Sequence, residues 1–299
     1  MLSTTRRTFI ADSAGVLGAL FFSAPAFSAP ATRRFPIITF SKPFQSLSFD
    51  DTADLLREVG YDGIECPVRK KGQVEPEQVE ENLPKLHEAL QKRGADLTLI
   101  TTDIGGVNVL NEKVLRTAAK LGVKRYRLTP FSYDLTKAIP PQLTNLKAQL
   151  RDLAALNKEL GMQGGVQNHS GHDKIGAPIW DIYELINDID PEHLGTCFDI
   201  GHATVEGGSS WPIEARLMEP YLACVYVKDF LWKKSDKGWS TEWVPLGEGM
   251  VNRAFFGWLK QSSYHGPISQ HCEYLNGGGP KERAQMKKDL AVLKGWLAD

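Results

Sequence analysis

The amino-acid sequence predicts an α/β protein, a closed (β/α)8 TIM-type barrel in which eight parallel strands lie inside a ring of helices. Short β-rich runs alternate with amphipathic helical stretches, and the alternation repeats eight times along the chain. Regular strand–helix alternation indicates a parallel sheet, and eight such units are the number that closes into a barrel. An open, doubly wound sheet is the alternative, but no G-x-G-x-x-G pattern follows the first strand.

The predicted elements can be placed in order along the chain. The strands are the short β-rich runs at 35–40, 63–66, 95–101, 125–128, 163–168, 194–199, 223–229 and 267–273. The helices are the amphipathic stretches at 51–59, 76–93, 112–121, 141–160, 178–187, 212–219, 253–262 and 281–297. Proline or aspartate stands near several helix starts, and four of the helices are followed by a glycine, at Gly60, Gly94, Gly122 and Gly161.

Residues 1–29 predict an export signal rather than part of the fold. The pair Arg6-Arg7 begins a twin-arginine pattern, and the uncharged stretch at 13–24 is followed by small residues. That stretch is too short to span ~30 Å of hydrocarbon, so we expect cleavage, delivery to the periplasm and no stable membrane span in the mature protein. An uncleaved membrane anchor is the alternative. The remaining residues, 30–299, are close to the ~250 of a typical barrel and predict a single domain.

The charge and the cysteines limit the possible classes. Lys and Arg number 35 against 36 Asp and Glu, and no basic cluster suited to phosphate backbones is present, so we expect no nucleic-acid partner. All four cysteines fall in predicted strands without C-x-x-C spacing, which indicates small buried residues: Cys66, Cys197, Cys224 and Cys272. A Cys197–Cys224 disulfide is the alternative, since the periplasm is oxidising.

One interval breaks the regular alternation. Residues 230–251 contain Trp232, Trp239 and Trp243 and follow the seventh strand, on the side of a barrel where active sites form. Because three tryptophans are costly to expose, the interval predicts a lid or a sugar-stacking wall, with Trp232 as a candidate substrate contact. A surface excursion that covers a helix is the alternative.

Polar side chains gather at the carboxyl ends of strands five to eight. Alternate residues of a barrel strand face the interior, so side chains of one parity converge on one rim. In chain order these are Gln167, His169, Asp199, Tyr226, Lys228, Ser269, His271 and Glu273. A polar sector of four consecutive strands predicts a functional site.

Four motifs resemble those of a known family. They are Gln167-Asn168-His169-Ser170-Gly171, Phe198-Asp199-Ile200-Gly201-His202, Val227-Lys228-Asp229 and Gly266-Pro267-Ile268-Ser269. In kind and order they resemble the motifs of the xylose isomerase-like TIM-barrel proteins, often described as sugar phosphate isomerases or epimerases. The resemblance runs from about Phe35 to the end of the chain. It implies a divalent metal held at the tops of strands five to eight, commonly by Glu, Asp, His and Glu, and two glutamates that shuttle a proton beside a carbonyl.

Position by position, this chain departs from the family's pattern. Asp199 keeps the strand-six acid, but Gln167 stands in place of the strand-five Glu and Tyr226 in place of the strand-seven His. His271 takes the position of the strand-eight Glu, with Glu273 two residues further on. The resemblance then implies that Gln167, Asp199 and His271 hold a divalent ion (Mn, Mg, Zn or Co). Glu273 or His202 is a further candidate ligand, and the paired-glutamate shuttle is lost.

Other rim residues are candidates for the base and for substrate binding. His169 and Lys228 are the groups most easily tuned to act as a base near neutral pH, and Glu273 is the third catalytic candidate. A backbone-bonded loop histidine and a salt-bridged surface lysine are the alternatives for the first two. Glu65, at the end of the second strand, and His202 are candidate substrate contacts, together with Trp232.

The expected function is that of a carbohydrate-active enzyme with a small-molecule sugar as its partner. A metal would polarise a carbonyl and a rim base would remove the neighbouring proton, giving isomerisation or epimerisation. β-Elimination from a 3-keto glycoside, by a lyase using the same site, is the alternative reaction. A non-catalytic sugar-binding barrel is the alternative of another class, and a metal-dependent endonuclease is a third. The oligomeric state is left open.

Overall fold

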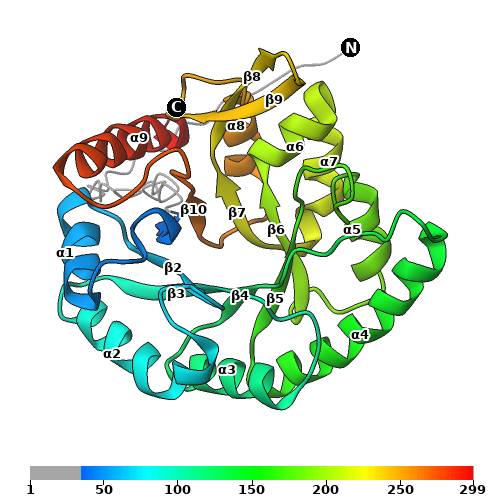
Figure 1. Ribbon diagram of the computed structural model, residues 1–299, viewed down its shortest axis with the longest axis horizontal. Coiled ribbons are helices and arrows are strands. Elements are labelled where there is room, and N and C mark those ends of the chain that lie inside the picture. The colour runs from blue at the N-terminus through cyan, green and yellow to red at the C-terminus, as the bar shows by residue number, and fades with distance from the viewer. Residues whose placement is uncertain (1–34, 299) are drawn as a thin grey trace, which may run out of the picture. The chain divides into compact units, whose positions relative to one another are not determined.

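The computed structural model describes residues 35–298, which form a closed parallel barrel (Figure 1). Going round the barrel, the strands follow the order β1-β10-β7-β6-β5-β4-β3-β2, and every neighbouring pair is parallel. The strands are β1 (Ile37–Phe40), β2 (Gly63–Val68), β3 (Asp96–Thr102), β4 (Arg125–Arg127), β5 (Gln163–Gln167), β6 (Leu194–Asp199), β7 (Leu222–Val227) and β10 (Ile268–Gln270). The predicted fold class is confirmed, whereas the predicted export signal at 1–29 lies outside the described residues.

Helices surround the barrel and cover the outer face of the strands (Figure 1). They are α1 (Phe49–Val59), α2 (Val79–Gln91), α3 (Val109–Lys120), α4 (Ile139–Leu160), α5 (Ile179–Ile186), α6 (Ile200–Gly207), α7 (Trp211–Met218), α8 (Ala254–Gln261) and α9 (Pro280–Ala298). Helix α1 ends at Gly60 with φ 96° and α4 at Gly161 with φ 62°. Both conformations are left-handed, which is why the predicted helix ends require glycine.

Helix α6 was missed by the sequence analysis, and its start explains why. It begins at Ile200, directly after the last residue of β6, with no intervening loop. Asp199 caps the helix, since its carboxylate accepts a hydrogen bond from the backbone N–H of His202. One acid therefore ends a strand and begins a helix. No helix in the described part of the chain has the length and apolarity to cross a bilayer.

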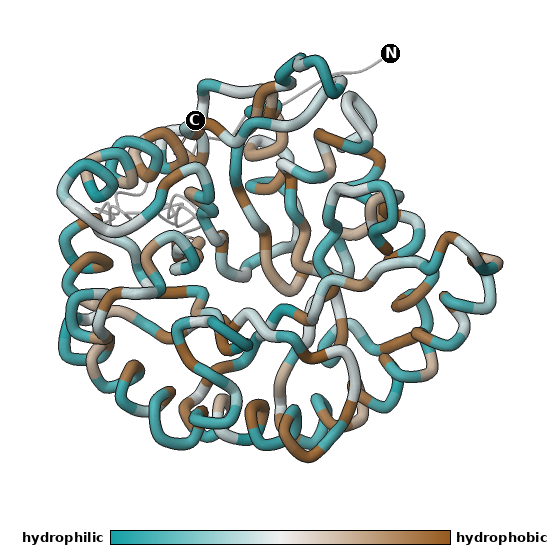
Figure 2. Tube along the Cα trace, in the orientation of Figure 1, coloured by the Kyte–Doolittle hydropathy of each residue, from teal (hydrophilic) through white to brown (hydrophobic). Residues whose placement is uncertain are grey.

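The core has two layers. The larger layer lies between the strands and the helices, and the helices alternate hydrophobic and hydrophilic residues along their length (Figure 2). The smaller layer fills the barrel interior and consists of Ile38, Leu99, Cys197, Cys224 and Tyr226. The interior is crowded, because a Cβ atom at Gly165 would overlap the Sγ atom of Cys197.

The cysteines are small buried residues, as predicted. Cys197 and Cys224 are register partners on β6 and β7, but their thiols are free, so the alternative of a disulfide is wrong. Cys66 and Cys272 are also free and buried. Cys272 lies beyond β10, which ends at Gln270 rather than continuing to residue 273 as the sequence analysis expected.

The interval at 230–251 is a β-hairpin rather than an irregular loop. Strands β8 (Asp229–Ser235) and β9 (Gly238–Val244) pair antiparallel and continue from β7 (Figure 1). Their turn contains Gly238 at φ 102°, a conformation that favours glycine. The three tryptophans separate: Trp232 and Trp239 are 41% and 64% exposed, whereas Trp243 is half-buried.

Asp229 anchors the segment that returns from the hairpin. Its Oδ1 accepts hydrogen bonds from the backbone N–H groups of Phe230 and Val251 at 3.0 and 2.9 Å. Its Oδ2 accepts from Gly247 and Gly249, both at 3.0 Å. One buried carboxylate thus satisfies four backbone donors, which a neutral amide with a single acceptor oxygen cannot do.

We predict that Asp229→Asn destabilises the protein, because two of the four backbone N–H groups lose their acceptor. The expected loss in the free energy of unfolding is about 2 kcal/mol or more, since hydrogen bonds to charged groups are among the stronger ones. Urea denaturation measures it. The control is Asp236→Asn in the exposed hairpin turn. Equal midpoints for the two variants would contradict the anchoring role of Asp229.

Candidate functional site

The candidate site lies at the carboxyl ends of the strands. Gln167 and Asp199 are the last residues of β5 and β6, Lys228 follows β7 and His271 follows β10. Hydrogen bonds and ion pairs connect these side chains through Glu273, Glu65 and His202, as described below. The polar sector that the sequence predicted is therefore brought together at one rim of the barrel.

Lys228 is the centre of the cluster. Its Nζ lies 2.8 Å from Nε2 of His202, 3.2 Å from Oδ2 of Asp199 and 3.2 Å from Oε1 of Glu273. It also lies 4.3 Å from the centroid of the Trp243 ring. The residue is 5% exposed, so Lys228 is salt-bridged but is not the surface lysine of the alternative interpretation. Its three donors all have acceptors, which is the condition for burying an ammonium group.

Asp199 is fully buried beside this ammonium group. Its Oδ1 accepts from the backbone N–H of His202 at 3.1 Å, and its Oδ2 accepts from Nε2 of Gln167 at 2.9 Å. Burial by itself would raise the pKa of Asp199, but the charge of Lys228, the neighbouring histidines and the backbone hydrogen bond from His202 together outweigh burial and hold the pKa at about 2. Asp199 is therefore a permanent carboxylate.

His202 is held in its neutral form. The ammonium group of Lys228 can only donate, so Nε2 of His202 accepts, and Nδ1 carries the proton and donates to Oγ of Ser170 at 2.7 Å. Burial and the neighbouring charge of Lys228 lower the pKa of His202 well below its ordinary value. Both nitrogens are thus used by protein partners.

His169 is neutral too, but one of its nitrogens is left for a substrate. Nδ1 lies 2.8 Å from the carbonyl oxygen of Ser170, which can only accept, so Nδ1 carries the proton and Nε2 keeps a lone pair. Burial lowers the pKa of His169, and the charges of Lys228 and Arg127 lower it further. The ring is half-buried and stacks on His202 with 4.0 Å between centroids. His169 thus makes the backbone hydrogen bond that the alternative interpretation expected, and this bond leaves Nε2 as the nitrogen with the lone pair.

A second cluster joins Glu65 to His271. Oε2 of Glu65 accepts from Nε2 of His271 at 2.9 Å and from Oγ of Ser269 at 2.6 Å. Nδ1 of His271 lies 3.7 Å from Oε1 of Glu273. Burial would lower the pKa of His271, but the two carboxylates outweigh burial and raise it. The two carboxylates therefore favour the protonated form of His271, which lies between Glu65 and Glu273 with the ring of Tyr226 packed on it at 4.3 Å.

The contacts of the three expected metal ligands leave few of their polar atoms for a cation. The amide oxygen of Gln167 accepts from Nη1 of Arg127 at 2.7 Å, its amide nitrogen donates to Asp199, and Nε2 of His271 is bonded to Glu65. Nδ1 of His271 lies 3.7 Å from Oε1 of Glu273 and has no hydrogen-bond partner within the described residues. Lys228 supplies the positive charge between Asp199 and Glu273. Within residues 35–298, no group of three or more His, Cys, Asp or Glu is arranged to hold a metal ion, so in this arrangement Gln167, Asp199 and His271 do not fit a divalent cation.

The remaining predicted residues divide into two groups. Glu273 is half-buried and its Oε2 binds Nζ of Lys42 at 2.5 Å, so it connects the buried cluster to the surface. Trp232 packs edge-on against Phe230 with 5.8 Å between centroids and, among the described residues, makes no ring contact with the cluster. The tryptophan that does contact the cluster is Trp243, whose ring lies 5.3 Å from that of His202.

Arg127 was not among the predicted site residues, and of the three tryptophans Trp232 rather than Trp243 was the predicted substrate contact. Arg127 is the last residue of β4 and therefore ends at the same rim, but a strand of three residues gives little pattern. Trp239 and Trp243 share one face of β9, so alternation does not separate them; Trp243 pairs with Phe230 at the base of the hairpin, and Trp239 lies near its turn.

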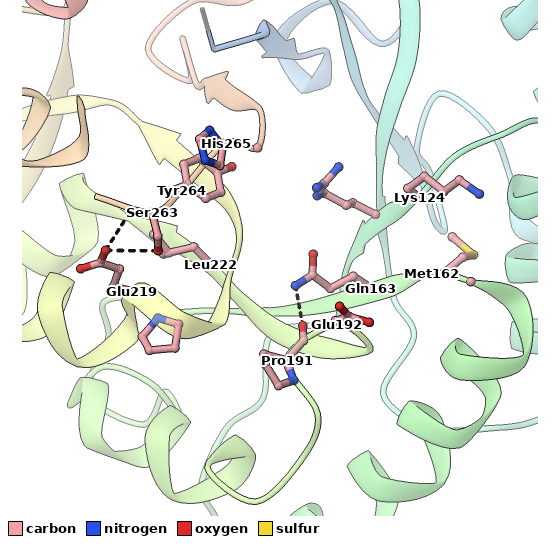
Figure 3. Close-up of a pocket in the computed structure, with 14 residues that line it drawn as sticks. Lys124, Met162, Gln163, Pro191, Glu192, Glu219, Leu222, Ser263, Tyr264 and His265 are labelled. Atoms are coloured by element: carbon pink, nitrogen blue, oxygen red, sulfur yellow. Dashed lines mark hydrogen bonds between the residues drawn. The ribbon is translucent and has the colours of Figure 1, made fainter. Parts of the chain in front are cut away.

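A hollow of about 440 Å³ lies at the opposite end of the barrel (Figure 3). Its lining includes Arg125, Gln163 and Leu222, the first residues of β4, β5 and β7. Gln163 points to the carbonyl of Pro191, to which it donates at 2.7 Å. None of the predicted site residues lines this hollow. In barrels of this kind function resides at the carboxyl ends of the strands, so we place the candidate site at the other rim.

We predict that a chelator leaves the thermal midpoint of the wild-type protein unchanged and that the purified protein carries less than one divalent ion per chain. Lys228→Met should lose about 3–5 kcal/mol of stability, because Asp199 and Glu273 are left without their shared cation. Thermal and urea unfolding, with metal analysis, measure these effects. The control is Lys233→Met, whose exposed ammonium group pairs with Glu242 at 2.9 Å. A stoichiometric metal whose removal lowers the midpoint would contradict the assignment.

Comparison with solved structures identifies relatives of the fold. A D-allulose 3-epimerase from Methylomonas sp. superposes with a TM-score of 0.69 at 16% identity, over 89% of this chain and 99% of that one. A xylose isomerase-like TIM barrel protein from Mycobacterium smegmatis, in complex with magnesium, superposes with a TM-score of 0.65 at 17% identity, again over 89% and 99%. At these identities the likeness shows the fold alone.

Sequence comparison identifies the family. An uncharacterized protein from Methanocaldococcus jannaschii is 27% identical over 159 residues, which cover 52% of this chain and 52% of that protein. The chain thus spans about half the length of the curated relative that it matches. The family model described as xylose isomerase-like TIM barrel matches residues 53–296, which include all of the strand ends that form the candidate site. The chain therefore belongs to the xylose isomerase-like TIM barrel family.

Proposed function

We propose that this protein is a sugar isomerase or epimerase that removes the proton next to a carbohydrate carbonyl, with His169 as the base. Family membership supports an enzyme of this superfamily, and a solved relative is a D-allulose 3-epimerase. The observation that carries the proposal is the state of His169: a neutral ring, half-buried, with the lone pair of Nε2 uncommitted among the described residues.

The base is prepared by its surroundings. Because the Ser170 carbonyl fixes the tautomer, Nε2 is the nitrogen that faces a ligand's proton. Because burial and nearby cations lower the pKa of His169, the ring stays unprotonated at neutral pH. A base with a pKa somewhat below the working pH is ready in nearly every molecule, which is the condition for efficient general-base catalysis.

Two buried cations that act on His169 would also stabilise the product of proton removal. When the C–H proton moves to Nε2, the electron pair of the bond passes into the neighbouring carbonyl and its oxygen becomes negative. Lys228 and Arg127, both buried, carry the positive charges that lower the pKa of His169, and the same charges would favour this negative oxygen. Preorganised charge of this kind is commonly the largest single contribution to catalysis. Return of the proton from Nε2 to the adjacent carbon gives an isomer, whereas an epimer forms when water or a second acid on the opposite face gives a proton to the original carbon and His169 releases the proton it removed.

The proposal assigns the electrophilic role to protein cations rather than to a divalent metal. Its basis is the bonding of the acceptor atoms: Asp199 is paired with Lys228, and Gln167 is bonded to Arg127. His271, the third predicted ligand, lies between Glu65 and Glu273 and is bonded to Glu65 through Nε2. No step of the proposed reaction depends on a metal.

We predict that His169→Gln lowers proton exchange by about 10²- to 10⁴-fold, the usual contribution of a general base. The measurement is deuterium uptake from D₂O by free ketoses and 3-keto-glucosides, followed by NMR. The pKa of His169 is lowered from 6.5, so Nε2 becomes protonated only at a pH below 6.5. Exchange by the wild type should therefore fall as the pH drops through this lowered pKa. The variant should lose this acidic limb.

The control for this prediction is His172→Gln, three residues further along the same loop and exposed to solvent. It should keep the wild-type rate and pH profile. Full exchange by the His169 variant would overturn the proposed base. No exchange by the wild type with any of these sugars would instead favour a non-catalytic sugar-binding barrel.

We also propose that the protein works in the periplasm after twin-arginine export, on the strength of Arg6-Arg7. Replacing both with lysine should retain the protein in the cytoplasm, as cell fractionation and blotting would measure. The matched control is the same replacement at Arg33-Arg34, which lies after the proposed signal. Equal export of the two double variants would refute the proposal.

A further inference from the structure

Two arginines at the rim lack an acidic partner. Arg69 directly follows β2, and Arg127 is the last residue of β4, so both lie at the carboxyl ends of strands. Their guanidinium carbons lie 5.7 and 5.9 Å from the centroid of the Phe40 ring, which places both cations around one aromatic side chain. Neither forms an ion pair with a carboxylate within the described part of the chain.

The nearby acids are already bonded to other groups. Glu65 binds His271 and Ser269, and Glu273 binds Lys228 and Lys42. Asp199 pairs with Lys228. The cations of the rim therefore exceed the anions by the two guanidinium groups.

Asp103 does not remove this excess. It is exposed, its Oδ2 accepts from the backbone N–H of Lys70 at 3.2 Å, and it lies beyond ion-pair distance of Arg69. Arg69 and Arg127 therefore repel each other. Burial, and then the charge of Arg127, lower the pKa of Arg69.

Arg127 has a free donor edge. Its Nη1 donates to Oε1 of Gln167 at 2.7 Å, whereas its Nε, in a residue 5% exposed, has no hydrogen-bond partner within residues 35–298. A buried donor without an acceptor is costly, and such groups are normally satisfied by a ligand, an ion or water. The edge that contains Nε is one that binds both oxygens of a carboxylate.

The loop that carries Arg69 is held in place before any ligand binds. The backbone N–H of Arg69 donates to Val74 and its carbonyl accepts from Gly72, which closes a tight turn. Lys71 in this turn has φ 57°, the left-handed region that a non-glycine residue rarely adopts. Its backbone N–H donates to Oε1 of Glu75 at 2.8 Å. Arg69 thus starts from a fixed backbone, which lowers the entropic cost of ordering it on a ligand.

We propose that Arg69 and Arg127 bind a carboxylate of the substrate, so that the protein acts on an acidic carbohydrate. This inference rests on the proposed function for the location of the reacting carbonyl, because Arg127 also acts electrostatically on His169. The free edge of Arg127 matches the two oxygens of a carboxylate, and because a phosphate ester can bind the same edge in a bidentate way, the test includes a sugar of each kind.

The test is isothermal titration of the full mature chain with D-glucuronate, D-glucose and D-glucose 6-phosphate. Wild-type protein should bind glucuronate at least about tenfold more tightly than glucose. Arg69→Gln should weaken glucuronate binding by roughly 10- to 100-fold, the range for hydrogen bonds between charged groups, and leave glucose binding unchanged. Arg253→Gln, an exposed arginine preceding α8, is the control and should behave as the wild type. Thermal unfolding checks that Arg69→Gln remains folded.

Each outcome bears on one of the two proposals. Equal affinity for glucuronate and glucose, or an Arg69→Gln variant that binds glucuronate as the wild type does, overturns the carboxylate site. A preference for glucose 6-phosphate that depends on Arg69 overturns it in favour of a phosphate. Deuterium exchange that requires His169 but is indifferent to Arg69 leaves the proposed function standing without the acidic substrate. Binding of glucuronate that requires Arg69, without exchange on any sugar, supports the anion site and overturns the reaction.

Discussion

The buried ammonium group of Lys228 is the interaction on which the rest of the candidate site depends. It is bonded to Asp199, Glu273 and His202, which come from different segments of the chain. Its charge favours the ionised form of Asp199, and together with burial, which is the larger cause, it lowers the pKa values of His202 and the stacked His169. A lysine in this position therefore acts on the protonation of three neighbours at once, through short-range electrostatics in a region with little water.

The barrel fixes the geometry of this charged cluster and so lowers the entropic cost of bringing its groups together. Each charged group stands at the end of a strand or in the residues directly after one, so its backbone is held by the sheet before the charges meet. Glu65, His271 and Glu273 form a second chain of alternating charge that joins the first at Glu273. Together the two clusters bury carboxylates without leaving them unpaired, which is the usual requirement for ions inside proteins.

Much of the fold could be predicted from local pattern. The strand runs and the glycines after α1 and α4 are short-range signals, and they locate the elements to within a few residues. Errors arose where the pattern is brief or shared. Helix α6 begins without a loop, because Asp199 is both the last residue of β6 and the cap of the helix. The hairpin β8–β9 was expected to be a loop, because its tryptophans interrupt the usual alternation of apolar and polar residues.

The sequence by itself determined the barrel, the family resemblance and the rim on which polar residues meet, since these follow from periodicity and from the order of motifs. Only the tertiary structure decided which partners the rim residues bond. Gln167, Asp199 and His271 resemble metal ligands in the sequence. In the structure, Gln167 is bonded to Arg127, Asp199 pairs with Lys228, and His271 is bonded to Glu65. Partners far apart in the chain meet only after the barrel closes. Whether a side chain binds a metal or forms an ion pair depends on distances of a few ångströms between its atoms and their neighbours. The spacing of residues along the sequence therefore does not distinguish the two roles.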